Sequence, residues 1–234
     1  MRQIVLDTET TGLNVKLGDR IIEIGCVELL SRRISERSFH VYVNPEREID
    51  EGASRVHGLT RDDLRSKPKF AEVAADFLDY VRGAELIIHN ADFDVEFLDA
   101  ELKRLGLGKL REHVAGVVDT LAHARELHPG RKNSLDALCE RYFINNSGRT
   151  LHGALLDARL LAECYLAMTR GQESLVMELE APAAMAAAAE ALRVDATSLI
   201  ILRAAPDELA LHDQYLEAME KDAKGPSLWR RLFG

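Results

Sequence analysis

The chain has 234 residues and a formal net charge of −9, with 47% hydrophobic and 29% charged residues. This composition supports a packed core and excludes a globally disordered chain, while the negative charge argues against a protein that holds nucleic acid on a broad basic surface. The longest uncharged apolar run, around residues 181–189, is too short for a membrane span of about 20 residues, and the first residues lack the apolar segment of a signal peptide.

Cysteine usage agrees with a reducing compartment. Cys26, Cys139 and Cys164 are scattered along the chain, and they form no CxxC pair. An odd number of isolated cysteines is typical of reduced core thiols rather than of a disulfide framework or a zinc site. We therefore expect a cytoplasmic protein that makes no contact with a membrane.

Three strands are predicted near the start of the chain. Residues 3–6 form a short apolar run that ends in acids, and residues 20–30 are rich in β-branched side chains. Residues 34–43 alternate between apolar and polar side chains up to the turn signal Asn44-Pro45. The short links between these runs favour an antiparallel meander.

Helical periodicity then takes over. Apolar side chains recur at positions 70, 73, 74, 77, 78 and 81, which predicts a helix over 70–81. Residues 85–89 predict a buried strand, and residues 94–105 a helix closed by Gly106. A strand is expected at 117–118, followed by helices near 120–127, 134–142 and 154–169. This order predicts an α/β fold with a mixed sheet flanked by helices.

The composition changes after Arg170. Residues 171–234 carry a net charge of −5, and eight of the eleven residues from 181 to 191 are alanine. A helix is expected over 207–221, but these pieces cannot form a useful core by themselves. We predict a domain at 1–170, a tether at 171–191 and a docking tail at 192–234.

Two acids end the first predicted strand. Strand alternation points Asp7 and Glu9 to one face, with α-carbons about 6.6 Å apart, and Thr8 to the other face. Two carboxylates beside an apolar run would repel each other, and divalent cations would remove that cost. A strand end that simply meets solvent gives the same short pattern, and for this pair alone it is the better interpretation.

Two more acids stand where the chain leads into a helix. Asp94 belongs to the segment HNADFD, which follows the predicted strand 85–89. Asp157 belongs to HGALLD, which begins with His152 at the start of a late helix. Taken singly, each acid is typical of an ordinary helix acid favoured by the helix dipole.

The order of these elements is more specific than any one of them. The segments VLDTETTGL, IIHNADFDVEFL and LHGALLDARLLAECYL resemble, in sequence, the three motifs of the DEDDh family of 3′→5′ exonucleases. Asn44-Pro45 and the segment VHGLT at 56–60 are similar to intervening segments of that family. The resemblance covers residues 1–170 and implies the ribonuclease H-like fold, a mixed five-stranded sheet flanked by helices.

The resemblance also implies the chemistry. Two divalent ions, Mg²⁺ or Mn²⁺ by the hardness of the oxygen ligands, would be bound by four acids: Asp7, Glu9, Asp94 and Asp157. His152 would be the general base. Two such ions can clamp the attacking and leaving oxygens of a phosphoryl displacement. The implied reaction removes nucleoside 5′-monophosphates from a DNA 3′ end.

Four further residues are implied as substrate contacts. Thr8 and Thr10 would lie near the scissile phosphate, and His57 beside the terminal nucleotide. Phe93 could stack on a base, which tolerates any sequence. A capped loop histidine and a core aromatic are the alternatives for His57 and Phe93. Contacts to the nucleic-acid backbone carry no sequence information, so little sequence preference is expected.

A short segment after the domain resembles a bacterial sliding-clamp-binding peptide. It is QESLVM at 172–177, in which Gln172, Leu175 and Met177 would contact the clamp. Met177 stands where stronger forms of the peptide have an aromatic side chain, so weak binding is expected. A simple continuation of the last helix is the equal alternative.

The end of the chain resembles the polymerase-binding tail of bacterial proofreading subunits. The matching stretches are PDELALH at 206–212 and SLWR at 227–230. Trp229, the single tryptophan of the sequence, would anchor the catalytic subunit of a replicative polymerase. Such tethering raises the effective concentration of the exonuclease at the frayed end.

These features allow three functions to be compared. The leading interpretation is a proofreading exonuclease subunit, and the first alternative is a stand-alone RNA or DNA trimming exonuclease of the same family. The second alternative, a binding module with a dead site, is disfavoured because the four acids and the histidine are all present.

Overall fold

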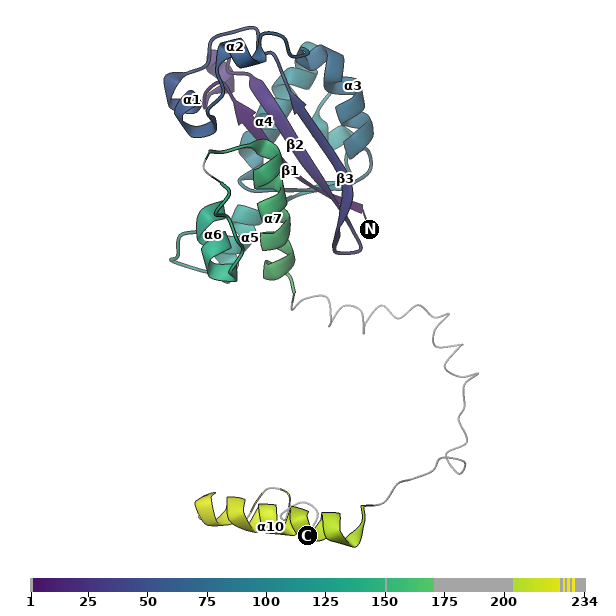
Figure 1. The fold of residues 1–234 in the computed structure, drawn as a ribbon. Helices are drawn as coiled ribbons and strands as arrows, with labels where there is room; N and C mark the ends of the chain where they lie inside the picture. Colours follow the sequence, from purple (N-terminus) through teal and green to yellow (C-terminus); the bar gives the residue numbers. More distant parts are fainter. Residues whose placement is uncertain are drawn as a thin grey trace, which may run out of the picture. The chain divides into compact units, whose positions relative to one another are not determined.

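The computed structural model describes residues 2–149, 151–170, 204–223, 225, 227 and 229. The chain forms two units, Met1–Met177 and Glu178–Gly234, which are considered separately. The first unit contains every strand of the described residues and is shown as the large domain in Figure 1.

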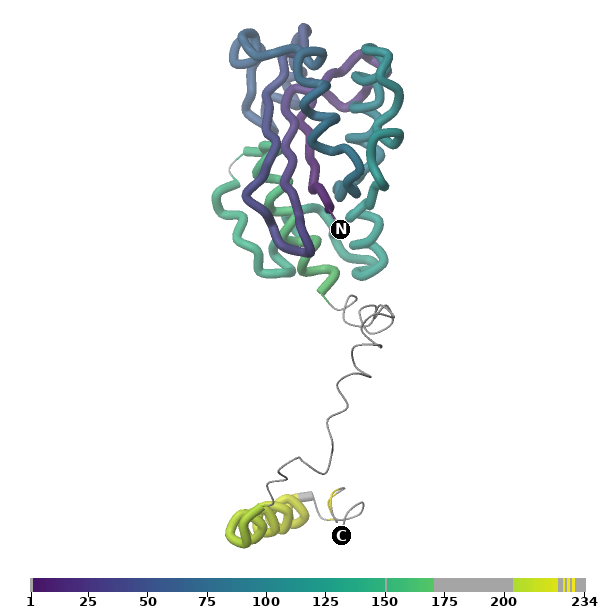
Figure 2. Tube along the Cα trace, turned by 90° about the vertical axis from the view of Figure 1, so that its right-hand side faces the viewer, coloured from purple at the N-terminus to yellow at the C-terminus, as the bar shows by residue number. Residues whose placement is uncertain are grey.

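Strand β1 (Arg2–Thr10) lies in the middle of a five-stranded sheet with the order β3-β2-β1-β4-β5. It pairs antiparallel with β2 (Ile21–Leu30), and β2 pairs antiparallel with β3 (Arg33–Tyr42); the three run side by side in Figure 2. β4 (Glu85–Ile88) runs parallel to β1, and β5 (Gly116–Asp119) parallel to β4. The predicted meander and the mixed sheet are both confirmed.

Two helices cover one face of the sheet. They are α3 (Phe70–Val81) and α4 (Ala91–Arg104), and their apolar side chains share a core with Ile4 and Leu6 of β1. All six apolar positions of α3 that the helical period selects are buried. The amphipathic pattern therefore settled both the bounds and the orientation of this helix.

The other face is covered by α7 (Ala154–Met168), whose apolar side chains pack on Val5, Val27 and Leu29. Helices α5 (Thr120–Leu127) and α6 (Leu135–Tyr142) pack beside α7. Because β1 alternates, Ile4 and Leu6 face α3 and α4 while Val5 faces α7. The two layers of helices are visible in Figure 1.

Some elements differ from the sequence prediction. β1 extends to Thr10, and α4 begins at Ala91 because Asn90 adopts the left-handed conformation with φ 68° and marks the boundary. Two short helices, α1 (Glu51–His57) and α2 (Arg61–Leu64), were not predicted. Elements this short carry too few residues for a periodic signal, and α2 depends on a capping box between Thr60 and Asp63.

One close approach positions α7. A Cβ atom placed on Gly25 would overlap the backbone of Ala154 and Leu155 at the start of this helix. Gly25 is paired with Asp7 across the β1–β2 ladder. The absence of a side chain therefore lets the first turn of α7 lie on β2 beside Asp7.

The described part of the second unit consists mainly of α10 (Pro206–Ala223), which confirms the helix expected near 207–221. Leu216 is buried, and Trp229 is half exposed, with its ring edge-on to His212 at a centroid distance of 5.7 Å. The tether and the clamp-peptide residues Gln172, Leu175 and Met177 lie outside the described residues. Within the ranges described, none of the helices has the length and apolarity needed to cross a bilayer.

Candidate active site

The site lies where β1 extends beyond its parallel neighbour β4. The β1–β4 pairing covers Gln3 to Val5, so Asp7 and Glu9 lie beyond it, near the carboxyl ends of both strands. In α/β sheets this edge is where ligands bind. A cavity of about 690 Å³ opens here, and its lining includes the four predicted metal ligands and the predicted base: Asp7, Glu9, Asp94, Asp157 and His152.

Asp7 and Glu9 carry negative charge that their surroundings disfavour. Burial raises the pKa of Asp7 well above its usual value, and Asp94, Glu9 and Asp157 raise it further. Burial also raises the pKa of Glu9 to about 8, with added repulsion from Asp157 and from Glu23, its partner across the ladder. The two carboxylates at the end of β1 are therefore held close to other acids in a poorly solvated place.

Asp94 reaches the site from the first turn of α4, where it is buried. Its Oδ1 accepts a hydrogen bond of 2.7 Å from the Thr8 hydroxyl. Burial raises the pKa of Asp94 to about 7 despite this hydrogen bond. Thr8 points to the α4 face of β1, as alternation predicts, and its role in the structure is to orient Asp94.

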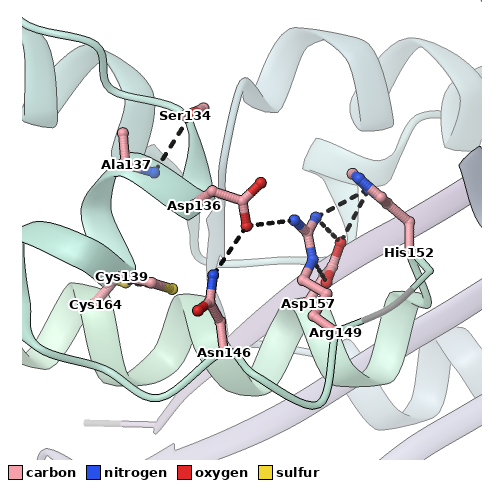
Figure 3. A network of polar contacts seen from close by, with 9 residues as sticks. All are labelled: Ser134, Asp136, Ala137, Cys139, Asn146, Arg149, His152, Asp157 and Cys164. Carbon is pink, nitrogen blue, oxygen red and sulfur yellow. Dashed lines mark hydrogen bonds and ion pairs between the residues drawn. The ribbon is translucent and has the colours of Figure 1, made fainter.

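Asp157 differs from these acids because an arginine side chain is paired with it. It lies in the first turn of α7, buried, and both of its oxygens accept hydrogen bonds from the Arg149 guanidinium, at 2.5 Å from Nε and 2.6 Å from Nη2. The same guanidinium donates to Asp136 Oδ1 at 2.7 Å and to His152 Nδ1 at 2.9 Å. Figure 3 shows Arg149 at the centre of this network.

His152 stands at the rim of the cavity with its side chain 44% exposed. Its Nδ1 lies 3.4 Å from Asp157 Oδ2, and its backbone N–H donates to the Val56 carbonyl of α1 at 3.1 Å. The unpredicted helix α1 therefore anchors the loop that carries His152.

The predicted substrate residues fall in three places. Thr8 and Phe93 line the acidic cavity. Both also line an adjacent, more apolar pocket of about 490 Å³, together with Thr10, Leu13 and others. His57 lines neither cavity: it is buried at the end of α1, and its Nδ1 accepts a hydrogen bond from the Leu59 N–H at 3.0 Å.

The donor set fits hard divalent cations. One ligand atom each from Glu9, His152 and Asp157 can be chosen so that all lie within 4.8 Å of one another. Asp7 and Asp94 line the same cavity, and burial raises the pKa values of Asp7, Glu9 and Asp94, although Arg149 lowers those of Asp7 and Glu9. Carboxylate oxygens in such numbers are typical of Mg²⁺ or Mn²⁺ sites.

The sequence interpretation missed the cationic part of the cavity. It consists of Arg125, Arg131 and Arg149, which line the cavity together with the neutral amide Asn133, and no sequence pattern singled out any of the four. The signal was weak: Arg149 lies three residues before His152 in SGRTLH, and a loop arginine is ordinarily solvated.

The family comparison agrees with the motif order. Residues 4–165 match the RNase_T family model, described as Exonuclease. Two relatives, both called DNA polymerase III subunit epsilon, match nearly the whole chain. The one from Pasteurella multocida (strain Pm70) is 50% identical over 98% of this chain and 94% of its own length. The one from Escherichia coli (strain K12) is 48% identical over 98% of this chain and 97% of its own length.

Solved structures show the same fold. Exonuclease X in complex with 5′ overhanging duplex DNA is 26% identical, with a TM-score of 0.58 over 73% of this chain and 93% of that one. The zinc-bound form of the Escherichia coli ExoI–ssDNA complex has a TM-score of 0.64 at 20% identity, over 76% of this chain and 42% of that one. The exonuclease fold inferred from the sequence is confirmed.

Proposed function

The chain belongs to the RNase_T exonuclease family, within the group of DNA polymerase III epsilon subunits, and we propose on that premise that it is a proofreading exonuclease of a replicative DNA polymerase. It would remove nucleoside 5′-monophosphates from a DNA 3′ end. The observation that supports this most directly is the meeting of four acids and His152, from three separate segments of the chain, around one cavity.

Four residues would hold two divalent cations: Asp7, Glu9, Asp94 and Asp157. When bound, such cations supply positive charge at the scissile phosphate and make a water more acidic. Four carboxylates match the charge of two divalent ions, and burial without them is costly. This balance explains why acids are concentrated in a place where burial and mutual repulsion raise their pKa values.

His152 would take the proton of the attacking water. His152 lies at the cavity rim with Nδ1 3.4 Å from Asp157 Oδ2, and its side chain is 44% exposed, so the ring lies beside the acids and within reach of solvent. A base so placed can receive a proton from water and release it to bulk solvent after the reaction.

The remaining lining residues would grip the strand. Arg125 and Arg131 offer donors on the wall of the cavity, which suits the phosphates that follow the scissile one. The adjacent apolar pocket, with Phe93 and Leu13, suits the terminal base by stacking and apolar contact. Local basic side chains thus serve a strand end although the chain as a whole carries a charge of −9.

The polymerase would be bound by residues 192–234, with Trp229 as an anchor, and a sliding clamp by residues 172–177. Support comes from the sequence similarity to epsilon subunits over 98% of the chain, which includes these segments. Trp229 is 54% exposed, and exposed aromatic side chains are frequent anchors of protein–protein interfaces.

A labelled oligonucleotide tests the activity. The full chain is mixed with 5′-labelled single-stranded DNA, or with RNA of the same sequence, in Mg²⁺, Mn²⁺ or EDTA. We expect stepwise shortening from the 3′ end of DNA and nucleoside 5′-monophosphate products, only with a divalent cation. Internal cuts, or shortening in EDTA, would contradict the proposal.

A pull-down tests the biological role. The intact chain should retain the catalytic subunit of the replicative polymerase, and a chain lacking 171–234 should lose it while still shortening DNA. Preferred cleavage of RNA together with no polymerase binding would instead identify a stand-alone trimming enzyme.

A further inference from the structure

Arg149 is a buried cation among anions. Its side chain is only 7% exposed, yet it belongs to the loop between α6 and α7 rather than to a helix or strand. It forms a two-pronged ion pair with Asp157, an ion pair with Asp136 and a hydrogen bond to His152. Such a geometry is strong because the planar guanidinium matches both carboxylate oxygens at once.

The pairing uses up a proposed metal ligand. Both oxygens of Asp157 are within 2.6 Å of guanidinium nitrogens, the distance of short charge-assisted hydrogen bonds. A divalent cation bound to either oxygen would face the Arg149 charge at close range. Arg149 and the cation therefore compete for one carboxylate.

The pairing also engages the proposed base. A guanidinium carries only donors, so in the contact of 2.9 Å the Nδ1 of His152 must be the acceptor. In the neutral ring the proton then sits on Nε2. Neither nitrogen of this tautomer offers a free lone pair to a water molecule, so His152 cannot act as a base while Arg149 holds it.

We propose that Arg149 is a resident counter-cation that occupies Asp157 in the metal-free enzyme and leaves it when a divalent cation binds, which releases Asp157 and His152 Nδ1 together. This inference rests on the proposed function. Arg149 thus acts as a positioning residue that couples cation loading to the availability of the base.

Asp136 is an anionic partner that Arg149 can keep after it has left Asp157. It lies in the first turn of α6, and its side chain is 59% exposed, so it stands at the edge of the cavity in contact with water. The Asn146 side-chain amide donates to the same Asp136 oxygen at 3.2 Å. Arg149 can therefore release Asp157 without losing every anionic partner.

Cation affinity gives the first test. In the full chain, Mn²⁺ binding is measured by titration calorimetry for wild type, Arg149→Gln, Arg149→Lys and the control Arg131→Gln. Arg131 lines the same cavity but is not among the partners of Asp157 in the described residues. We expect Arg149→Gln to bind Mn²⁺ about tenfold more tightly, since a competing charge is removed, and Arg131→Gln to bind within about twofold of wild type.

Thermal unfolding separates this role from a merely structural one. Arg149→Gln should lower the Tm in EDTA by about 5 °C, because Asp157 loses its buried partner, and by much less in saturating Mn²⁺. An equal loss of Tm with and without Mn²⁺, or an unchanged or weaker Mn²⁺ affinity, would overturn the inference.

Wild-type protein alone gives an independent readout. Nitrogen-15 NMR of His152 should show the Nε2–H tautomer without metal, and Mg²⁺ should remove the hydrogen-bond shift of Nδ1. A His152 signal that does not change when Mg²⁺ is added would contradict the coupling, and this test needs no variant. If Arg149→Gln fails to fold, Arg149→Lys replaces it in the affinity and unfolding tests, and it is expected to bind Mn²⁺ about twofold more tightly than wild type. Failure of the wild type to bind Mn²⁺ would instead refute the proposed function itself.

Discussion

The two sides of the cavity treat the same chemical group in opposite ways. Asp7, Glu9 and Asp94, on β1 and α4, form no ion pair within the described residues, and burial raises the pKa of each. Asp157, on α7, is also buried, but it pairs with the Arg149 guanidinium. In the described residues, the acids of β1 and α4 therefore have no cation paired with them, whereas Asp157 has one that the protein supplies.

This contrast separates two demands on a metal site. Ligands must be concentrated to bind cations, yet the empty site must still fold. Asp7, Glu9 and Asp94 meet the second demand because burial raises their pKa values, so that the metal-free site favours their protonated forms. Asp157 meets it by its ion pair with Arg149, which also holds the α6–α7 loop in place.

The largest effect is expected on the exonuclease rate when an acid of β1 is removed. Asp7→Asn should lower the exonuclease rate by at least about 10³-fold, because a ligand at the centre of the site is lost. It should also weaken Mn²⁺ binding while raising the Tm in EDTA, since a buried repelling charge disappears. Oligonucleotide assays and thermal melts check both effects. Asp92→Asn, an exposed acid on the same turn of α4, is the control and should change neither.

His152→Ala should lower kcat by about 10²- to 10³-fold, the usual contribution of a general base. Binding of Mn²⁺ should persist because the four acids remain. Rate measurements and calorimetry on the same preparation test this. A variant with near-full rate would remove His152 from the role of base and leave it as a rim residue.

Asp157→Asn should lower the stability of the metal-free protein, whereas Asp7→Asn should raise it. Loss of the carboxylate leaves Arg149 buried with one anionic partner fewer, which should cost about 2 kcal/mol of unfolding free energy in EDTA. Urea denaturation at neutral pH measures it. If Asp157→Asn and Asp7→Asn shifted stability in the same direction, the contrast between the two sides would be lost.

The smallest effect is expected from pH. The pKa of Glu9 rises from 4.5 to about 8 on folding, and that of Asp94 from 3.8 to about 7. The folded state binds more protons than the unfolded state in this range, so the contribution of these two acids to metal-free stability is full below about pH 4 and declines as pH rises to about 8. Thermal melts in EDTA should show the Tm falling by several degrees across this window, and Mn²⁺ should flatten the curve. A Tm that rises from pH 5 to 8 in EDTA would contradict the burial of these acids.

The elements that could be predicted are those with a local signal. The stripe of α3 from Phe70 to Val81 appears as predicted, because burial of one helix face imposes its period on the sequence. The order of the three acidic motifs likewise identified the exonuclease fold. Helices α1 and α2 were not predicted because one or two turns are too short to show a hydrophobic period. Their capping residues also occur in turns that form no helix, so they are not a sufficient signal.

By itself, the sequence determined the family, the mixed sheet and which acids to examine, since these depend on spacing along the chain. Only the tertiary structure decided how those acids are neutralised. Arg149 meets Asp157 and Asp136 because α6 and α7 pack together, and α7 reaches β1 because Gly25 leaves room for it. Electrostatic partners are set by distances between elements, and those distances are fixed by packing, which no local pattern records.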